Sequence, residues 1–168
     1  GELENLAYLL VHDSVYRKYE KEVKTDAAKK IFTVDGKEVK VFQEKDPARL
    51  PWQELAVDIV IEATGGFESF AKANAHLAAG ARRVVLTAPA DDADGTAGGK
   101  TVLMGINEEE LQKTVLTSNA SCTTNAASPV IQVMLENLGI EKAVLSTVHA
   151  YTATQSVVDG PARNASPH

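Results

Sequence analysis

The single cysteine of this 168-residue chain, Cys122, is the residue whose position points most directly to chemistry. A β-branched run at 114–117 predicts a strand before it, and apolar residues at helical spacing over 130–138 predict a helix after it. Ser121 is a natural N-cap, so we expect Cys122 in the first turn of that helix. There the N–H groups and the positive end of the helix dipole favour a thiolate, which is the nucleophilic form of cysteine.

A histidine follows at a useful separation. Residues 145–152 read as a further strand, and His149 lies on it. A strand, a helix and a strand in that order return the chain to one edge of a sheet, so we expect Cys122 and His149 to meet. An imidazole beside a thiol activates a sulfur nucleophile.

Each of these residues also has an ordinary interpretation. A lone cysteine is usually a small buried hydrophobic residue, and a lone histidine is usually a satisfied core or surface residue. The helix start favours chemistry at Cys122, and the pairing with Cys122 favours it at His149. His76 has no such partner in the sequence, so we assign it no role, and we interpret Asp58 and Glu62, on one strand, as a solvated or capping pair.

The elements that position these residues form an α/β pattern. Strands are predicted at 57–63, 84–87 and 102–104, with helices at 69–79 and from 107, which indicates a largely parallel sheet. The first of these strands reads as one buried on both faces. Because ligands bind where parallel strands end, the small and hydroxyl residues that follow the strands, including Thr64, Thr87 and Ser118, predict one ligand lying across neighbouring strand tips.

The remaining segments are simpler to interpret. An amphipathic helix begins near Leu3, a β-hairpin turns at Asp35-Gly36, and the small, acidic, glycine-rich segment at 91–99 reads as a flexible excursion. The chain begins at Gly1 in front of a helix and ends in a loop, so we expect it to be part of a longer protein.

Composition excludes several classes of function. The chain carries a net charge of −6, with 44% hydrophobic and 24% charged residues, as in an ordinary soluble globular protein without a basic face for nucleic acid or anionic membrane. One cysteine forms no internal disulfide and fits a reducing compartment. The sequence has no secretory signal, no apolar run of the ~20 residues that span a bilayer, no metal-binding cluster and no G-x-G-x-x-G turn.

Several stretches together resemble the glyceraldehyde-3-phosphate dehydrogenase family. The most specific are Ser-Asn-Ala-Ser-Cys-Thr-Thr-Asn at 118–125 and Thr-Val-His-Ala-Tyr-Thr-Ala-Thr-Gln at 147–155, with Glu-Ala-Thr-Gly-Gly-Phe at 62–67 and Thr-Ala-Pro-Ala at 87–90. The resemblance runs nearly end to end and in the right order. It implies a partial Rossmann-type NAD-binding domain over residues 1–121, with a largely parallel sheet, and the start of an α+β catalytic domain over residues 122–168.

The resemblance also implies an activity. It is the oxidative phosphorylation of glyceraldehyde 3-phosphate to 1,3-bisphosphoglycerate in glycolysis, with NAD as cofactor and inorganic phosphate as second substrate. Cys122 would attack the aldehyde to give a thiohemiacetal and then a thioester, and His149 would be the base. The preference between NAD and NADP stays open, because the glycine turn and the acidic residue that decide it are absent from the chain.

The family pattern assigns further residues. Ser121 and Thr123 would bind the attacking phosphate, and Thr152 would bind the phosphate of the substrate. The cofactor would contact Lys45, Thr64, Gly65 and Thr87. The arginine that holds the substrate phosphate in the family is expected beyond His168, so we expect the 168-residue chain alone to be inactive. The resemblance further implies a cytoplasmic homotetramer.

Three other functions remain open. A relative could act on another phosphorylated aldehyde, such as erythrose 4-phosphate. A Cys–His hydrolase using Cys122 would cleave esters without a nicotinamide. The chain could also be a non-catalytic fragment that assembles with other subunits.

Overall fold

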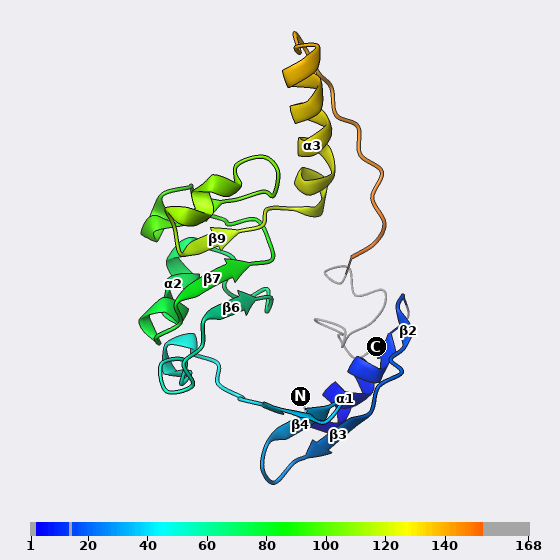
Figure 1. The fold of residues 1–168 in the computed structure, drawn as a ribbon, viewed down its shortest axis with the longest axis vertical. Helices are drawn as coiled ribbons and strands as arrows, with labels where there is room; N and C mark the ends of the chain where they lie inside the picture. Colours follow the sequence, from blue (N-terminus) through cyan, green and yellow to red (C-terminus); the bar gives the residue numbers. More distant parts are fainter. Residues whose placement is uncertain (1–2, 14, 153–168) are drawn as a thin grey trace, which may run out of the picture. The chain divides into compact units, whose positions relative to one another are not determined.

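A computed structural model describes residues 3–13 and 15–152 of the chain (Figure 1). The described residues divide into two compact units, one of residues 44–147 and one of the described residues before 44 and after 147. The expected domain boundary between residues 121 and 122 falls inside the first of these units, at the junction of a strand and a helix, and it stays a prediction.

The unit of residues 44–147 is built on a parallel sheet. Its strands are β6 (Ile59–Glu62), β7 (Arg83–Leu86), β8 (Lys100–Thr101) and β9 (Leu116–Ser118), in the order β6-β7-β9-β8. All three pairings are parallel, and β6, β7 and β9 lie side by side in Figure 1. The α/β class and the parallel sheet predicted from the sequence are therefore confirmed, although β8 ends before the predicted 102–104 and β9 begins two residues after the predicted 114.

Helix α2 (Phe70–Ala78) covers one face of this sheet. Its first turn is fully capped: the Ser69 hydroxyl accepts from the Lys72 N–H at 3.2 Å, and the Asp92 carboxylate accepts from the first two N–H groups of the helix at 2.8 and 2.9 Å. The core that forms beneath the helix consists of Val60, Phe70, Ala73, Ala81, Val84, Leu86 and Leu116.

The other face of β6 is open. Val60 and Glu62 are buried, whereas Ile59 and Ile61 are 56% and 67% exposed. The prediction of a strand buried on both faces was therefore wrong, because within the described residues α2 covers only the face to which the even-numbered residues point.

The glycine-rich segment at 91–99 is anchored rather than flexible. Asp92 caps α2, and the Asp94 carboxylate accepts from both the N–H and the hydroxyl of Thr101 at 2.9 Å. A short 3₁₀ helix, η2 (Thr96–Gly98), closes the segment. Two further 3₁₀ helices, η1 (Pro47–Arg49) and η3 (Glu108–Gln112), complete the connections of this unit.

Helix α3 (Cys122–Asn137) follows β9 directly (Figure 1). Ser121 is its N-cap, as predicted, and Gly139 follows its end with a positive φ of 75°. Pro129 lies within the helix, which continues on both sides of it.

The strand predicted at 145–152 is absent. Among the described residues, 142–152 form no regular element. Val144 and Val148 are 97% and 102% exposed, so these β-branched residues have no sheet face to pack on, and a strand does not form without a partner strand.

The second unit combines one helix with antiparallel strands. It contains α1 (Leu3–Val11), β1 (His12–Asp13), β2 (Arg17–Lys18), β3 (Val23–Asp26), β4 (Ile31–Val34) and β5 (Lys37–Lys40). The predicted hairpin is β4–β5, and its turn residues Asp35 and Gly36 both have positive φ, at 51° and 77°, as the Asp-Gly signal requires. β3, which extends this hairpin to three strands, lies in a charged segment and was not predicted.

No helix in the described part of the chain is both long enough and apolar enough to cross a membrane.

Candidate active site

The ends of β6, β7 and β9 bring the predicted ligand-binding residues to one edge of the sheet. In the parallel register Glu62 lies beside Leu86, and Leu86 lies beside Ser118. Thr64 and Thr87, which follow β6 and β7, therefore emerge at the same edge and are exposed. This confirms the predicted grouping of strand tips, while the binding role of each residue stays a prediction.

The turn that presents Cys122 is held by a small set of hydrogen bonds. The Ser121 hydroxyl accepts from the Thr124 N–H at 3.0 Å and lies 2.7 Å from the Thr124 hydroxyl. The Asn125 amide donates to the carbonyls of Asn119 and Ser121 at 2.7 and 2.9 Å. These contacts start α3 at Cys122, which is exposed in its first turn. The N-terminal position that favours a thiolate is therefore present.

A buried serine joins this turn to the neighbouring strand end. The Ser118 hydroxyl donates to the Ala88 carbonyl at 2.7 Å and accepts from the Ala120 N–H at 3.1 Å, and the Asn119 N–H donates to the Leu86 carbonyl at 2.9 Å. Ser118 is only 1% exposed. The segment after β7, which carries Thr87, and the segment before α3 are thereby fixed to each other.

The residues of this edge fit a dinucleotide cofactor. The segments at the strand ends, 63–66, 87–90 and 118–121, contain mostly small and hydroxyl side chains and no charged residue. Gly65 has a φ of 70°, a backbone conformation that favours glycine and leaves the turn without a side chain at that point. Backbone groups at such an edge are accessible to a flat ligand.

Other predicted site residues lie apart from these strand tips in the chain. Thr123 follows Cys122 in the first turn of α3 and is half-buried. Lys45 is exposed in the loop that precedes η1, where its N–H donates to the Glu44 carboxylate at 2.9 Å. Their contacts with phosphate and cofactor stay predictions.

His149 and Thr152 are exposed, and both belong to the other compact unit. The Nδ1 of His149 lies 2.5 Å from the Ala150 carbonyl oxygen. The pairing of His149 with Cys122 is therefore a prediction that neither unit, described by itself, tests.

Sequence reasoning missed a buried polar cluster beneath the edge. Glu62 and His76 are 6% and 5% exposed, and His76 Nε2 lies 2.9 Å from a Glu62 carboxylate oxygen. The interpretation of Asp58 and Glu62 as a solvated or capping pair was right only for Asp58, which pairs with Arg82 at the surface. The sequence periodicity could have indicated this burial. Glu62 lies two residues from buried Val60 on the same face of the strand, and His76 lies three residues from buried Ala73 on the same face of the helix.

The carboxyl of Glu62 is perturbed by this setting. Burial raises its pKa, but hydrogen bonds from Thr64 and His76 lower the pKa by more, and the net pKa lies below the ordinary value of 4.5. Glu62 is therefore a carboxylate at neutral pH and acts only as a hydrogen-bond acceptor.

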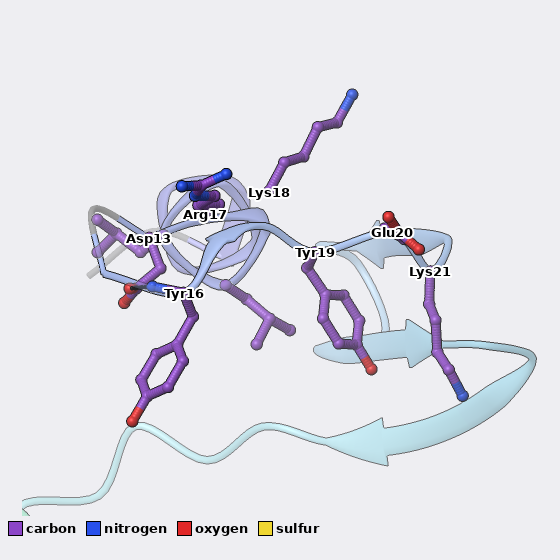
Figure 2. Close-up of a pocket in the computed structure, with 9 residues that line it drawn as sticks. Asp13, Tyr16, Arg17, Lys18, Tyr19, Glu20 and Lys21 are labelled. Atoms are coloured by element: carbon purple, nitrogen blue, oxygen red, sulfur yellow. Dashed lines mark hydrogen bonds between the residues drawn. The ribbon is translucent and has the colours of Figure 1, made fainter.

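A cavity of about 690 Å³ lies in the other unit, beside α1, and none of the predicted site residues lines it (Figure 2). Figure 2 shows Tyr16 and Tyr19 on one side of the backbone and Arg17 and Lys18 on the other. Arg17 and Lys18 therefore lie away from the two tyrosines, and Lys21 is paired with Asp35 at 2.6 Å. Among the residues described, no group of three or more His, Cys, Asp or Glu is arranged to hold a metal ion.

Comparison with known families gives matches to both parts of the chain. Residues 1–70 match the family model described as glyceraldehyde 3-phosphate dehydrogenase, NAD binding domain. Residues 121–166 match the model described as glyceraldehyde 3-phosphate dehydrogenase, C-terminal domain.

Individual relatives agree with the family models. The chain is 46% identical over 157 residues to a glyceraldehyde-3-phosphate dehydrogenase of Thermotoga maritima, which covers 93% of the chain and 45% of the relative. It is 44% identical over 160 residues to glyceraldehyde-3-phosphate dehydrogenase 2 of Bacillus subtilis, covering 94% of the chain and 45% of the relative. The match to the Eremothecium gossypii enzyme is 44% over 155 residues, covering 92% and 44%. The chain thus spans about half the length of the curated relatives it matches.

Proposed function

We propose, from the premise that this chain belongs to the glyceraldehyde-3-phosphate dehydrogenase family, that the natural protein carrying it is an NAD-dependent, phosphorylating aldehyde dehydrogenase. Its substrates are glyceraldehyde 3-phosphate and inorganic phosphate, and its product is 1,3-bisphosphoglycerate. The resemblance inferred from the sequence motifs is confirmed at the level of the family.

The observation that supports this proposal most directly is the position of Cys122. It is exposed in the first turn of α3, at the end of a parallel strand, next to the neutral rim formed by the segments after β6 and β7. This is the position from which a thiolate could reach a carbonyl carbon lying over the strand tips.

Sulfur suits both halves of the reaction. The Cys122 thiolate adds to the aldehyde carbon and forms a thiohemiacetal. Loss of hydride from that carbon leaves a thioester on Cys122, and phosphate oxygen then attacks the acyl carbon and releases the thiolate with its bonding electrons. One residue therefore serves as nucleophile and as leaving group.

His149 is the proposed base of this sequence. It takes the thiol proton of Cys122, returns that proton to the aldehyde oxygen as the thiohemiacetal forms, and removes it again from the hydroxyl as hydride departs. Ser121 and Thr123 bind the attacking phosphate beside the N–H groups of the α3 N-terminus, which favour an anion, and Thr152 binds the phosphate of the substrate.

Thr64, Gly65, Thr87 and Lys45 are the proposed contacts of the cofactor. The match of residues 1–70 to an NAD binding domain supports NAD, which when bound supplies the hydride acceptor. Thr64, Gly65 and Thr87 would hold the cofactor at the strand tips. We also place the protein in the cytoplasm as a homotetramer, on the family resemblance.

The first test is the reactivity of Cys122 in the 168-residue chain. Since the chain has one cysteine, a whole-protein mass shift with iodoacetamide reports on Cys122 alone. We expect alkylation near neutral pH at least several-fold faster than that of free cysteine, and a slower rate in His149→Asn. An equal alkylation rate in His149→Asn would contradict the role of His149 as the base. Alkylation of Cys122 no faster than that of free cysteine would contradict an activated nucleophile.

The second test is a rate assay on the natural protein. Reduction of NAD should require both phosphate and an aldehyde, and glyceraldehyde 3-phosphate should give a higher kcat/KM than erythrose 4-phosphate. Cys122→Ser should lower kcat by at least 10³-fold, while Ala126→Ser, four residues further along α3, should leave it near the wild-type value. Ester cleavage that is independent of nicotinamide would favour a hydrolase instead.

A further inference from the structure

Three residues of the unit of residues 44–147 form a continuous chain of hydrogen bonds. They lie next to the edge of the sheet where β6, β7 and β9 end. Trp52 lies before β6, Glu62 ends β6, and His76 lies in the last turn of α2. The side chains of Glu62 and His76 are 4% and 6% exposed, and Trp52 packs against the core. We call these three residues the Glu62 triad.

The direction of these hydrogen bonds is fixed by the indole. Trp52 Nε1 lies 3.0 Å from His76 Nδ1, and an indole N–H can only donate, so Nδ1 accepts and carries no proton. His76 must then carry its proton on Nε2, which donates to a Glu62 oxygen at 2.9 Å. The ring is held by Trp52 at a centroid distance of 6.2 Å and by Phe67, edge-on, at 6.3 Å. Trp52 therefore selects one tautomer of His76.

The other carboxylate oxygen of Glu62 holds the turn at 64–66. It accepts from the Thr64 N–H at 2.7 Å and from the Thr64 hydroxyl at 2.5 Å. The Thr64 hydroxyl in turn accepts from the Gly66 N–H at 3.2 Å. The backbone at Thr64, Gly65 and Gly66 is thus set by a carboxylate whose own orientation is set by His76.

A purely space-filling role would not need these groups. Burying a carboxylate and an imidazole costs desolvation energy that apolar side chains of similar volume avoid, and a polar cluster of this kind is tolerated only when every member is hydrogen-bonded. What the polar residues add is direction, because each bond fixes an angle as well as a distance.

We propose that the Glu62 triad positions the turn at 64–66, so that His76 and Glu62 are positioning residues for the cofactor through Thr64 and Gly65, while Trp52 selects the tautomer of His76. The binding consequence rests on the proposed function, which places the cofactor at this turn. The geometric part concerns the turn alone.

The tautomer provides a specific test in the natural protein. In Glu62→Gln, the amide oxygen can still accept from Thr64, but the amide NH₂ then faces the Nε2–H of His76, donor against donor. We expect NAD binding, measured by isothermal titration, to weaken by about tenfold or more. Trp52→Phe alone leaves the bond from His76 to Glu62 in place, and it should change the affinity less than about threefold.

The double variant is the decisive arm. Without the indole donor, His76 can move its proton to Nδ1 and accept at Nε2 from the amide of Glu62→Gln. Trp52→Phe combined with Glu62→Gln should therefore bind NAD more tightly than Glu62→Gln alone, by at least threefold. Equal or weaker binding by the double variant would overturn the triad, as would wild-type affinity in Glu62→Gln.

A second pair of variants covers the case in which Glu62→Gln does not fold. The amide N–H of His76→Gln can still donate to Glu62, whereas His76→Leu cannot. We expect an affinity close to the wild type in the first variant and about tenfold weaker binding in the second. Equal affinities in the two variants would overturn the proposal.

The NMR chemical shifts of the Thr64 and Gly66 amides test the Glu62 triad independently of NAD binding. They should shift in Glu62→Gln and His76→Leu, and move back toward the wild-type values in the double variant and in His76→Gln. If the variants show this pattern but the wild type binds no NAD, the triad stands and the proposed cofactor site is wrong. Resonances that stay unchanged in all variants would overturn the triad, whatever the affinity for NAD.

Discussion

Glu62 shows how the ionisation of one buried carboxyl affects the stability of the fold. Its carboxylate accepts three hydrogen bonds, from the N–H and the hydroxyl of Thr64 and from His76. Burial raises the pKa of this carboxyl, the hydrogen bonds from Thr64 and His76 lower it by more, and the net pKa is below 4.5. A folded-state pKa below the unfolded value means that the ionised form stabilises the folded state.

This residue predicts an acid dependence of stability. The contribution of Glu62 is complete above the ordinary pKa of 4.5 and is lost as pH falls through the lower folded-state value. We expect the slope of unfolding free energy against pH below 4.5 to be shallower in Glu62→Gln than in the wild type, by at most about 1.4 kcal/mol per pH unit. Urea titrations at several pH values measure it.

Glu54→Gln is the matched control for this experiment, since Glu54 is exposed in the same unit. It should retain the wild-type slope. A Glu62→Gln slope equal to that of Glu54→Gln would show that the buried carboxylate does not stabilise the fold.

At the scale of elements, helix starts are the best-defined features of the larger unit. The first three N–H groups of α2 are bonded by two side chains, Ser69 from the adjacent position and Asp92 from 22 residues along the chain. The α3 start is bonded by Ser121 and Asn125. Capping thus determines where the two helices meet the sheet edge.

The α2 cap gives a second prediction. Ser69→Ala removes the acceptor of the Lys72 N–H and should destabilise the 168-residue chain by about 1 kcal/mol, because a partly buried N–H in the first turn of the helix loses its partner. Ser69→Gly should cost only a few tenths of a kcal/mol. Urea unfolding followed by the fluorescence of Trp52, the sole tryptophan, measures both. An equal cost for both variants would contradict a capping role.

Local signals predicted some elements well and others poorly. The N-cap Ser121, the end of α3 near Gly139 and the Asp-Gly hairpin were predicted, because each depends on chemistry within a few residues. The strand at 145–152 was wrong, because a strand needs a partner that local sequence does not reveal. The Glu62 triad was missed because Trp52, Glu62 and His76 meet only after β6 and α2 have packed together.

At the scale of the whole molecule, the two units differ in how much core they contain. The hydrophobic core cluster of the described residues lies entirely within residues 44–147, whereas in the other unit Leu3 is the only buried hydrophobic residue among those described. Since burial of apolar surface supplies most of the folding free energy, the unit of residues 44–147 should be the more stable of the two.

This difference predicts unfolding that is not two-state. In urea, Trp52 fluorescence follows only the unit of residues 44–147, while far-ultraviolet circular dichroism follows both units. We expect the circular dichroism signal to begin changing at a lower urea concentration than the fluorescence. Amides of β4 should also exchange with solvent at least tenfold faster than amides of β7. Coincident transitions and equal exchange rates would show instead that the two units unfold together.

The bond from the Ser118 hydroxyl to the Ala88 carbonyl has a practical consequence for inhibitor design. A covalent fragment attached to Cys122 that displaces the backbone before α3 must also strain the segment that carries Thr87. A fragment on Cys122 that leaves Ser118 undisturbed should therefore allow a second molecule to bind at the neighbouring strand tips. The fragment and the second molecule could then be linked into one compound.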